Sequence, residues 1–196
     1  MTTATATDTM TTDAMTKAPH LTHVHEAPTD PTRTVAHGTF VLERTYRHAP
    51  KTVFDAWAVR EKKHQWFPEA PGFLASIGTY ELDFLVGGRE YLDGPLRSGP
   101  RFEYDSIYGD IVDGRRIVAT YDVRINDKRI SVSLLTVEFE PRADGGTHLA
   151  MTEQGAFLDG LDTNDERIKG ADESLDALDA YLAGSVAQVP TAGVVS

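Results

Sequence analysis

Apolar and polar residues alternate along several short stretches of the chain, a pattern typical of strands that bury one face of a sheet. The expected strands are 39–46, 80–86, 89–93, 102–112, 116–124, 131–140 and 147–157. Turn residues separate them, and Asp113-Gly114 is the strongest two-residue hairpin signal, with a further turn at Asn126-Asp127. Because successive strands are joined by short connections, the pattern predicts an antiparallel meander.

Helices are predicted at three places around these strands. Pro50 suits the first turn of a short helix over 51–58, and a second short helix follows at about 60–65. Near the C-terminus, Thr163 and Glu166 have the spacing of a capping box. Apolar residues then form one stripe that must cover a sheet: Ile168, Ala171, Leu175, Leu178 and Leu182. The opposite face is acidic and is expected to face solvent: Asp172, Glu173, Asp176 and Asp179.

One charged residue interrupts the apolar face of the strand predicted over 147–157. Leu149, Met151 and Glu153 share that face, so a carboxylate occupies a position where a buried apolar residue is expected. A charge on the buried face of a sheet is costly unless a partner or a ligand compensates it. Glu153 is therefore the first candidate for a functional residue.

Composition excludes several classes of protein. The chain has 196 residues, 40% of them hydrophobic, which fits one domain with a sizeable core. Its formal net charge is -11 and its basic residues are scattered, so it lacks the basic surface of a nucleic-acid-binding protein. It has no cysteine, which excludes disulfides and thiolate chemistry. Since it shows no apolar run of roughly 18 residues and no signal-peptide pattern, we expect a cytoplasmic protein that does not associate with a membrane.

The two ends of the chain differ in composition from its middle. Residues 1–37 are dominated by Thr, Ala, Pro and His without an apolar period, and we expect a disordered N-terminal arm. Residues 185–196 follow Gly184 and contain Pro190, and we expect a loose C-terminal tail. A single domain over 38–184 remains between them.

Histidines in the N-terminal arm are candidate metal ligands. His20, His23 and His25 lie close together in the arm, with His37 nearby, and imidazoles at this density can chelate zinc, copper or nickel. A coil preforms no coordination geometry, however, so we expect adventitious binding there rather than a metal site. His48, His64 and His148 are expected at the surface of the domain, and serine nucleophile motifs are absent. We therefore expect neither a metal nor a cofactor.

Short motifs accompany the order of one strand, two short helices, about six strands and a long helix. They are Ala49-Pro50-x-x-Val53-Phe54-x-Ala56-Trp57, Trp66-Phe67, Asp83-Phe84-x-Val86-Gly87-Gly88, Tyr108-x-Asp110-Ile111-Val112, Arg116-Ile117-Val118, Gly146-Thr147-x-Leu149, Thr152-Glu153-Gln154-Gly155, and Gly170 with Leu175-x-x-Leu178. On these motifs, residues 38–183 resemble the helix-grip, START-like SRPBCC superfamily. Within it, the chain is similar to the bacterial branch related to the C-terminal domain of the Hsp90 ATPase activator Aha1 (AHSA1-like).

The resemblance implies an α+β helix-grip fold, in which a curved antiparallel sheet of about seven strands and two short helices enclose a cavity with a long C-terminal helix. In many relatives this cavity holds an apolar or amphipathic small molecule. The same fold also hosts lipid carriers, plant hormone receptors, cyclases and hydroxylase subunits, so it implies no single activity.

Along two neighbouring strands, the side chains expected on the inner face of the sheet change from apolar at one end to polar at the other. If 131–140 and 147–157 pair through the turn at Asp144-Gly145, Ser131 or Ser133 comes near Glu153. The predicted cavity residues are Trp66, Phe84, Tyr104, Tyr108, Tyr121, Ser133, Leu135, Met151, Glu153 and Phe157. In the functional interpretation, the polar end of an amphipathic ligand meets Glu153. In the structural interpretation, Arg, Tyr or backbone donors simply satisfy this carboxylate.

Three functions remain open. We favour binding of a small apolar or amphipathic molecule. The second is a cavity enzyme of the cyclase, lyase or hydrolase type with Glu153 as acid/base, because a buried carboxyl group retains its proton more readily. The third is a protein interaction like that of the Hsp90 activator, although residues 1–37 are too short and polar to replace that protein's N-terminal domain. Apolar residues expected on the outer sheet face, Val132 and Leu134, are compatible with a homodimer.

Overall fold

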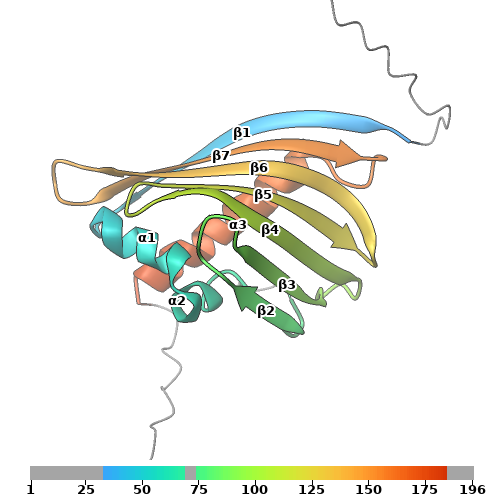
Figure 1. The fold of residues 1–196 in the computed structure, drawn as a ribbon, viewed down its shortest axis with the longest axis horizontal. Helices are drawn as coiled ribbons and strands as arrows, with labels where there is room; N and C mark the ends of the chain where they lie inside the picture. Colours follow the sequence, from blue (N-terminus) through green and yellow to red (C-terminus); the bar gives the residue numbers. More distant parts are fainter. Residues whose placement is uncertain (1–32, 69–73, 185–196) are drawn as a thin grey trace, which may run out of the picture. The chain divides into compact units, whose positions relative to one another are not determined.

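One seven-stranded antiparallel sheet forms the framework of the protein (Figure 1). The computed structural model describes residues 33–68 and 74–184. The strands are β1 (Val35–Tyr46), β2 (Thr79–Leu82), β3 (Arg89–Pro95), β4 (Arg101–Val112), β5 (Arg116–Ile125), β6 (Lys128–Pro141) and β7 (Thr147–Leu158). β2 to β7 follow one another as the predicted meander, and β1 closes the order β1-β7-β6-β5-β4-β3-β2 by pairing with β7.

Three helices complete the α+β helix-grip fold that the resemblance implied. α1 (Pro50–Ala58) and α2 (Arg60–His64) connect β1 to β2, and α3 (Asn164–Leu182) runs beneath the concave face of the curved sheet (Figure 1). Thr163 caps α3, since its hydroxyl accepts a hydrogen bond from the Glu166 N–H at 3.2 Å, and Gly184 follows the helix at φ 72°. Both predicted ends of this helix are confirmed. Within the described ranges, no helix is long and apolar enough to cross a bilayer.

Buried residues of the inner sheet face fall into two apolar clusters. The larger one packs α1 and α3 against the sheet, and we call it the helix-anchoring cluster: Phe54, Trp57, Phe139, Leu149, Leu175 and Leu178. The smaller one lies on β3, β4 and β5, and we call it the cavity-side cluster: Leu92, Phe102, Tyr104 and Val123. Along β7 the side chains alternate as predicted, and Leu149, Met151 and Glu153 are all buried.

Two turns differ from the sequence-based expectation. The strand expected over 80–86 ends at Leu82, because the chain then folds back so closely that a Cβ on Gly88 would lie 2.2 Å from the Asp83 carbonyl oxygen. Val86 is consequently 59% exposed. The connection at Asp113-Gly114 has three residues rather than two, since Val112 pairs with Arg116.

The two-residue hairpin lies instead at Asn126-Asp127, between paired Ile125 and Lys128. Both turn residues have positive φ, at 49° and 63°, a conformation that Asn and Asp tolerate better than most residues. At the N-terminal end, β1 begins at Val35, so residues 35–37 of the expected arm belong to the sheet. Residues 1–32 and 185–196 lie outside the described residues.

The acidic face of α3 binds the sheet and is not simply solvated, which corrects the prediction. Arg44 of β1 lies against this face, with its Nη2 2.5 Å from Asp172 Oδ1 and 3.1 Å from Asp176 Oδ1. Its Nε lies 3.7 Å from Asp179 Oδ2. The hydrogen bond to Asp172 is the main reason that the pKa of Arg44 is raised. One cation of β1 therefore holds three carboxylates of α3.

Candidate functional site

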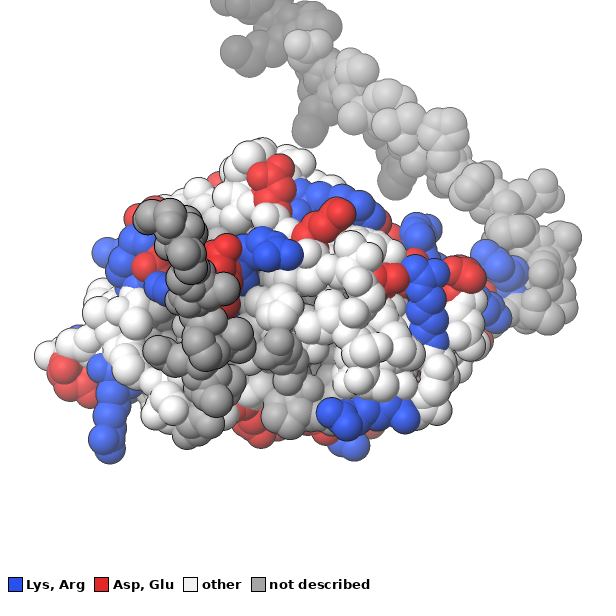
Figure 2. Space-filling model, turned by 90° about the horizontal axis from the view of Figure 1, so that it is seen from below, with Lys and Arg blue, Asp and Glu red and all other residues white. Residues whose placement is uncertain are grey.

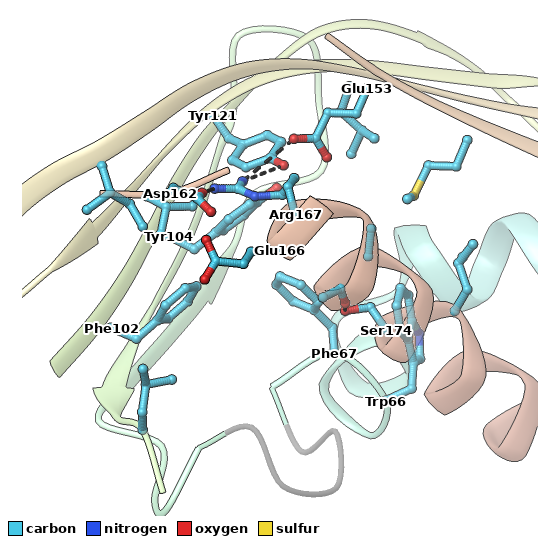
Figure 3. Close-up of a pocket in the computed structure, with 18 of the residues that line it drawn as sticks. Trp66, Phe67, Phe102, Tyr104, Tyr121, Glu153, Asp162, Glu166, Arg167 and Ser174 are labelled. Atoms are coloured by element: carbon cyan, nitrogen blue, oxygen red, sulfur yellow. Dashed lines mark hydrogen bonds and ion pairs between the residues drawn. The ribbon is translucent and has the colours of Figure 1, made fainter. Parts of the chain in front are cut away.

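A cavity of about 390 Å³ lies between α3 and the inner face of the sheet (Figure 3). Its aromatic lining comes from α1, the segment after α2, and strands β4 and β5: Trp57, Trp66, Phe67, Phe102, Tyr104 and Tyr121. Five charged residues also line it: Lys63, Glu153, Asp162, Glu166 and Arg167. The volume falls within the ~300–1,000 Å³ typical of small-molecule sites.

Arg167, in the first turns of α3, binds two carboxylates in the cavity wall (Figure 3). Its Nη1 donates to the Tyr121 hydroxyl at 2.9 Å and lies 3.6 Å from Glu153 Oε1. Its Nη2 donates to Asp162 and to the Ser131 hydroxyl. The guanidinium is thus shared between Glu153 and Asp162 and is only 11% exposed.

Glu153 receives a second contact from the neighbouring strand. Ser133 of β6 donates its hydroxyl proton to Glu153 Oε1 at 2.8 Å, and the carboxylate is 2% exposed. The predicted proximity of Ser133 and Glu153 is therefore confirmed. Because Arg167 and Ser133 both contact Glu153, the contacts match the structural interpretation, and the same carboxylate also faces the cavity.

Burial and neighbouring groups together set the protonation of Arg167 and of the tyrosines near it. Burial alone lowers the pKa of Arg167, but Tyr121, Glu153 and Asp162 together raise it above the ordinary value of a guanidinium. Burial raises the pKa of Tyr121, against the opposing effect of Arg167, and raises that of Tyr104. At neutral pH the guanidinium is charged and both phenols keep their protons.

A second buried ion pair borders the cavity at Lys63. The Lys63 Nζ lies 2.7 Å from Glu90 Oε2, and the two side chains are 5% and 1% exposed. Glu90 also accepts hydrogen bonds from Tyr80 at 3.1 Å and Tyr108 at 2.8 Å. The ammonium lies 5.2 Å and 5.1 Å from the ring centroids of Trp57 and Phe67, a cation–π arrangement.

A polar row crosses the inner face of the sheet between the two apolar clusters. It consists of one residue from each of four adjacent strands, each paired with the next in the sheet register: Glu90, Ser106, Tyr121 and Ser133. All four are buried. Lys63 binds this row at Glu90 and Arg167 binds it at Tyr121, so both cavity cations rest on it.

Most of the predicted cavity residues line the cavity, and four do not. The lining residues among them are Trp66, Tyr104, Tyr121, Leu135, Met151 and Glu153. Ser133 lies behind Glu153, and the Phe157 ring centroid lies 5.9 Å from the Arg167 guanidinium carbon. The rings of Phe84 and Tyr108 pack on each other with their centroids 4.9 Å apart. They lie on the side of the polar row where the helix-anchoring cluster lies. Phe84 is displaced because β2 ends at Leu82, and Tyr108 is turned to Glu90.

Sequence reasoning missed Arg167, Asp162 and the Lys63–Glu90 pair. A signal for Arg167 was present, because it lies four residues before Ala171 and so falls on the apolar stripe of α3. Glu90 likewise shares a strand face with Leu92, which is fully buried. Lys63 lies in a five-residue helix, which is too short for a face to be assigned from periodicity.

The histidine cluster His20–His25 lies outside the described residues, and His37 is exposed on β1. Within residues 33–68 and 74–184, no group of three or more His, Asp or Glu side chains is arranged to hold a metal ion. His148 lies on the outer sheet face between Glu43 and Glu140, at 3.5 and 3.8 Å.

Comparison with known proteins shows to which family the chain belongs. The family model described as "Activator of Hsp90 ATPase homolog 1-like protein" matches residues 47–183. The chain belongs to this family. It is an AHSA1-like member of the SRPBCC superfamily, whose fold is generally a ligand-binding one. A comparison with curated proteins finds no match.

Several solved structures of bacterial proteins are similar to this AHSA1-like chain. An uncharacterised protein from Rhizobium leguminosarum is 39% identical, with a TM-score of 0.72, over 78% of this chain and 98% of its own. The Mll3558 protein from Rhizobium loti is also 39% identical, with a TM-score of 0.69, over 76% of this chain and 99% of its own. Ara h 8.0201, at 15% identity and a TM-score of 0.59, covers 76% of this chain with 99% of its own and shares the fold alone.

Proposed function

We propose that this AHSA1-like protein binds a small amphipathic molecule in the cavity beneath α3. The observation that carries the proposal is the combination of a cavity of about 390 Å³ with an aromatic lining and a buried cluster of Arg167, Glu153 and Asp162 in the same wall. An apolar body packs against the rings, and a polar end meets the charged cluster.

Packing supports this proposal. Protein interiors are close-packed and contain few voids larger than a water molecule, so a space of this size between α3 and the sheet is one that a ligand can fill. Trp57 also lines the cavity, and among the described residues its buried indole N–H has no hydrogen-bond partner. A ligand oxygen or a water would satisfy this donor.

The test combines ligand detection with a pair of variants at one position. Native mass spectrometry of freshly purified protein reports a co-purified molecule, and thermal shift across lipids and aromatic metabolites identifies ligands. Gly170 lines the cavity, and a Cβ placed there meets nothing within 4 Å. Gly170→Phe therefore adds a ring at the cavity wall without moving the backbone, and we expect affinity to fall at least tenfold. Gly170→Ala, the matched control, keeps affinity and gains about 1 kcal/mol of stability.

Two outcomes would contradict the binding function. One is the absence of any shift across the panel together with no co-purified mass. The other is equal affinity of the Phe and Ala variants for an identified ligand, which would place the ligand elsewhere. The same mass spectra report stoichiometry and so test whether the protein is a homodimer, with which the outer face is compatible because Val132 is 43% exposed there and Leu134 is half-buried.

Catalysis by Glu153 is the second candidate, because this carboxylate faces the cavity while it is 2% exposed. Glu153→Gln keeps the size and hydrogen-bonding capacity of the side chain but removes its charge. Under the catalytic candidate, this variant retains ligand affinity and loses turnover of an identified ligand. A Gln variant with wild-type turnover excludes Glu153 as the acid/base.

A further inference from the structure

We propose that the polar end of the ligand is a cation, an ammonium group on an apolar or aromatic body, and not a carboxylate. The proposal rests on the binding function above and specifies its ligand class. It follows from the charge balance of the cavity wall, in which both cations are already bound and carboxylates are in excess.

Both cavity cations are committed to side chains of the protein. Arg167 donates to Tyr121, Ser131 and Asp162 and pairs with Glu153. Lys63 pairs with Glu90 at 2.7 Å beneath two aromatic rings. An anionic ligand would either displace a carboxylate from one of these cations or add a further negative charge beside it, and a buried carboxylate without a cation of its own is costly.

Carboxylates outnumber the cations that face them. Glu90 balances Lys63, so Arg167 alone remains to balance Glu153, Asp162 and Glu166. Glu153 and Asp162 are 2% and 9% exposed, so water compensates them poorly. Glu166 is exposed at the same side of the cavity, where its Oε2 accepts from the Thr163 hydroxyl at 2.9 Å. A cationic ligand would supply the missing positive charge.

Aromatic rings lie on the same side of the cavity as two of these carboxylates, Asp162 and Glu166. Figure 3 shows Asp162, Glu166 and Arg167 together on the side of the cavity where Phe102 and Tyr104 lie. Faces of aromatic rings attract ammonium groups, and this attraction is strongest where water is excluded. Carboxylates beside rings are therefore a combination that recognises an amine with an apolar body.

The charge of the whole chain acts in the same direction. The formal net charge is -11, which attracts cations and repels anions during diffusional encounter. Figure 2 shows Asp and Glu side chains beside Lys and Arg on the face seen from below, so the preference must come from the cavity groups and not from a uniform surface.

The test uses three probes with one body: 4-phenylbutylamine, 4-phenylbutanol and 4-phenylbutyric acid. Their affinities for the full chain are measured by calorimetry at pH 7. We expect the amine to bind at least tenfold more tightly than the acid and more tightly than the alcohol. An acid or an alcohol that binds as tightly as the amine overturns the ligand class but leaves the binding function intact. If none of the three binds and native mass spectrometry finds no ligand, the binding function and the ligand class both fail.

Two variants of α3, each of which removes one negative charge, test where the cationic end of the ligand binds. Glu166→Gln removes a carboxylate at the cavity, and Gln still suits this capping position. Glu173→Gln is the control, because Glu173 is exposed and pairs at 3.9 Å with Lys169 away from the cavity. We expect the amine-over-acid preference to fall about threefold in the first variant and to stay unchanged in the second. Equal changes in both would overturn the placement.

Discussion

Single residues of the site show what the periodicity of the sequence can predict and what it cannot. Alternation along 147–157 identified Glu153 as a buried carboxylate, and turn counting brought Ser133 near it, as the 2.8 Å hydrogen bond confirms. The partner on α3 could not be counted in this way, because the rotation of a helix over a sheet is set by packing and not by register. Asp162 lies in the connection before α3, where no period exists.

Arg167 should matter more for stability than either carboxylate that it binds. Arg167→Met leaves Glu153 and Asp162 buried without a cation, and we expect it to lower the free energy of unfolding by about 3 kcal/mol. Glu153→Gln keeps the Ser133 contact and leaves Arg167 paired with Asp162, so it should cost about 1 kcal/mol. Urea unfolding at pH 7 measures both. Equal losses would mean that the two carboxylates do not depend on the shared guanidinium.

At the scale of elements, most strands and all three helices could be predicted from the sequence. Boundaries failed where the chain makes close tertiary approaches, as at Gly88, because such contacts leave no periodic trace. The acidic face of α3 had the composition of a solvated surface, and only the sheet order, which puts Arg44 of β1 against it, revealed its role.

The two halves of α3 should differ in local stability. Its buried residues, Leu175, Ala177 and Leu178, lie in the C-terminal half, where Arg44 also holds Asp176 and Asp179. The N-terminal half supplies most of the residues by which this helix lines the cavity. We expect amide hydrogens of 168–171 to exchange faster than those of 175–182, and Arg44→Gln to speed exchange from Asp172 to the C-terminal end of the helix. Uniform protection along α3, measured by hydrogen exchange and mass spectrometry, would contradict this asymmetry.

The whole molecule should lose stability in acid, and the sign follows from two carboxylates of the sheet. Burial alone raises the pKa of Asp93, but its bonds to Arg101 and Thr79 lower it below the ordinary 3.8. The hydrogen bond from Arg89 lowers the pKa of Asp105 in the same way. A group whose pKa is lower in the folded state stabilises the fold above its unfolded pKa, and this contribution disappears as the pH falls through the folded pKa.

We therefore expect the free energy of unfolding, measured by urea titration, to be constant from pH 7 to about 5 and to fall below about pH 4, by about 1 kcal/mol from these two groups. Asp179 acts in the opposite direction, because burial raises its pKa and protonation then favours the folded state. Asp105→Asn should lower stability at pH 7 and flatten the acid limb. A variant with an unchanged acid limb would show that Asp105 does not contribute to it.

The polar row also separates two parts of the inner sheet face that have different roles. The helix-anchoring cluster on one side holds α1 and α3, whereas the cavity-side cluster on the other side supplies Phe102, Tyr104 and Val123 to the cavity wall. Substitutions in the second cluster can therefore reshape the space for a ligand while the contacts that fix the long helix remain untouched. In a fold divided in this way, ligand specificity can change through successive substitutions without any variant along the way losing the stability it needs to fold.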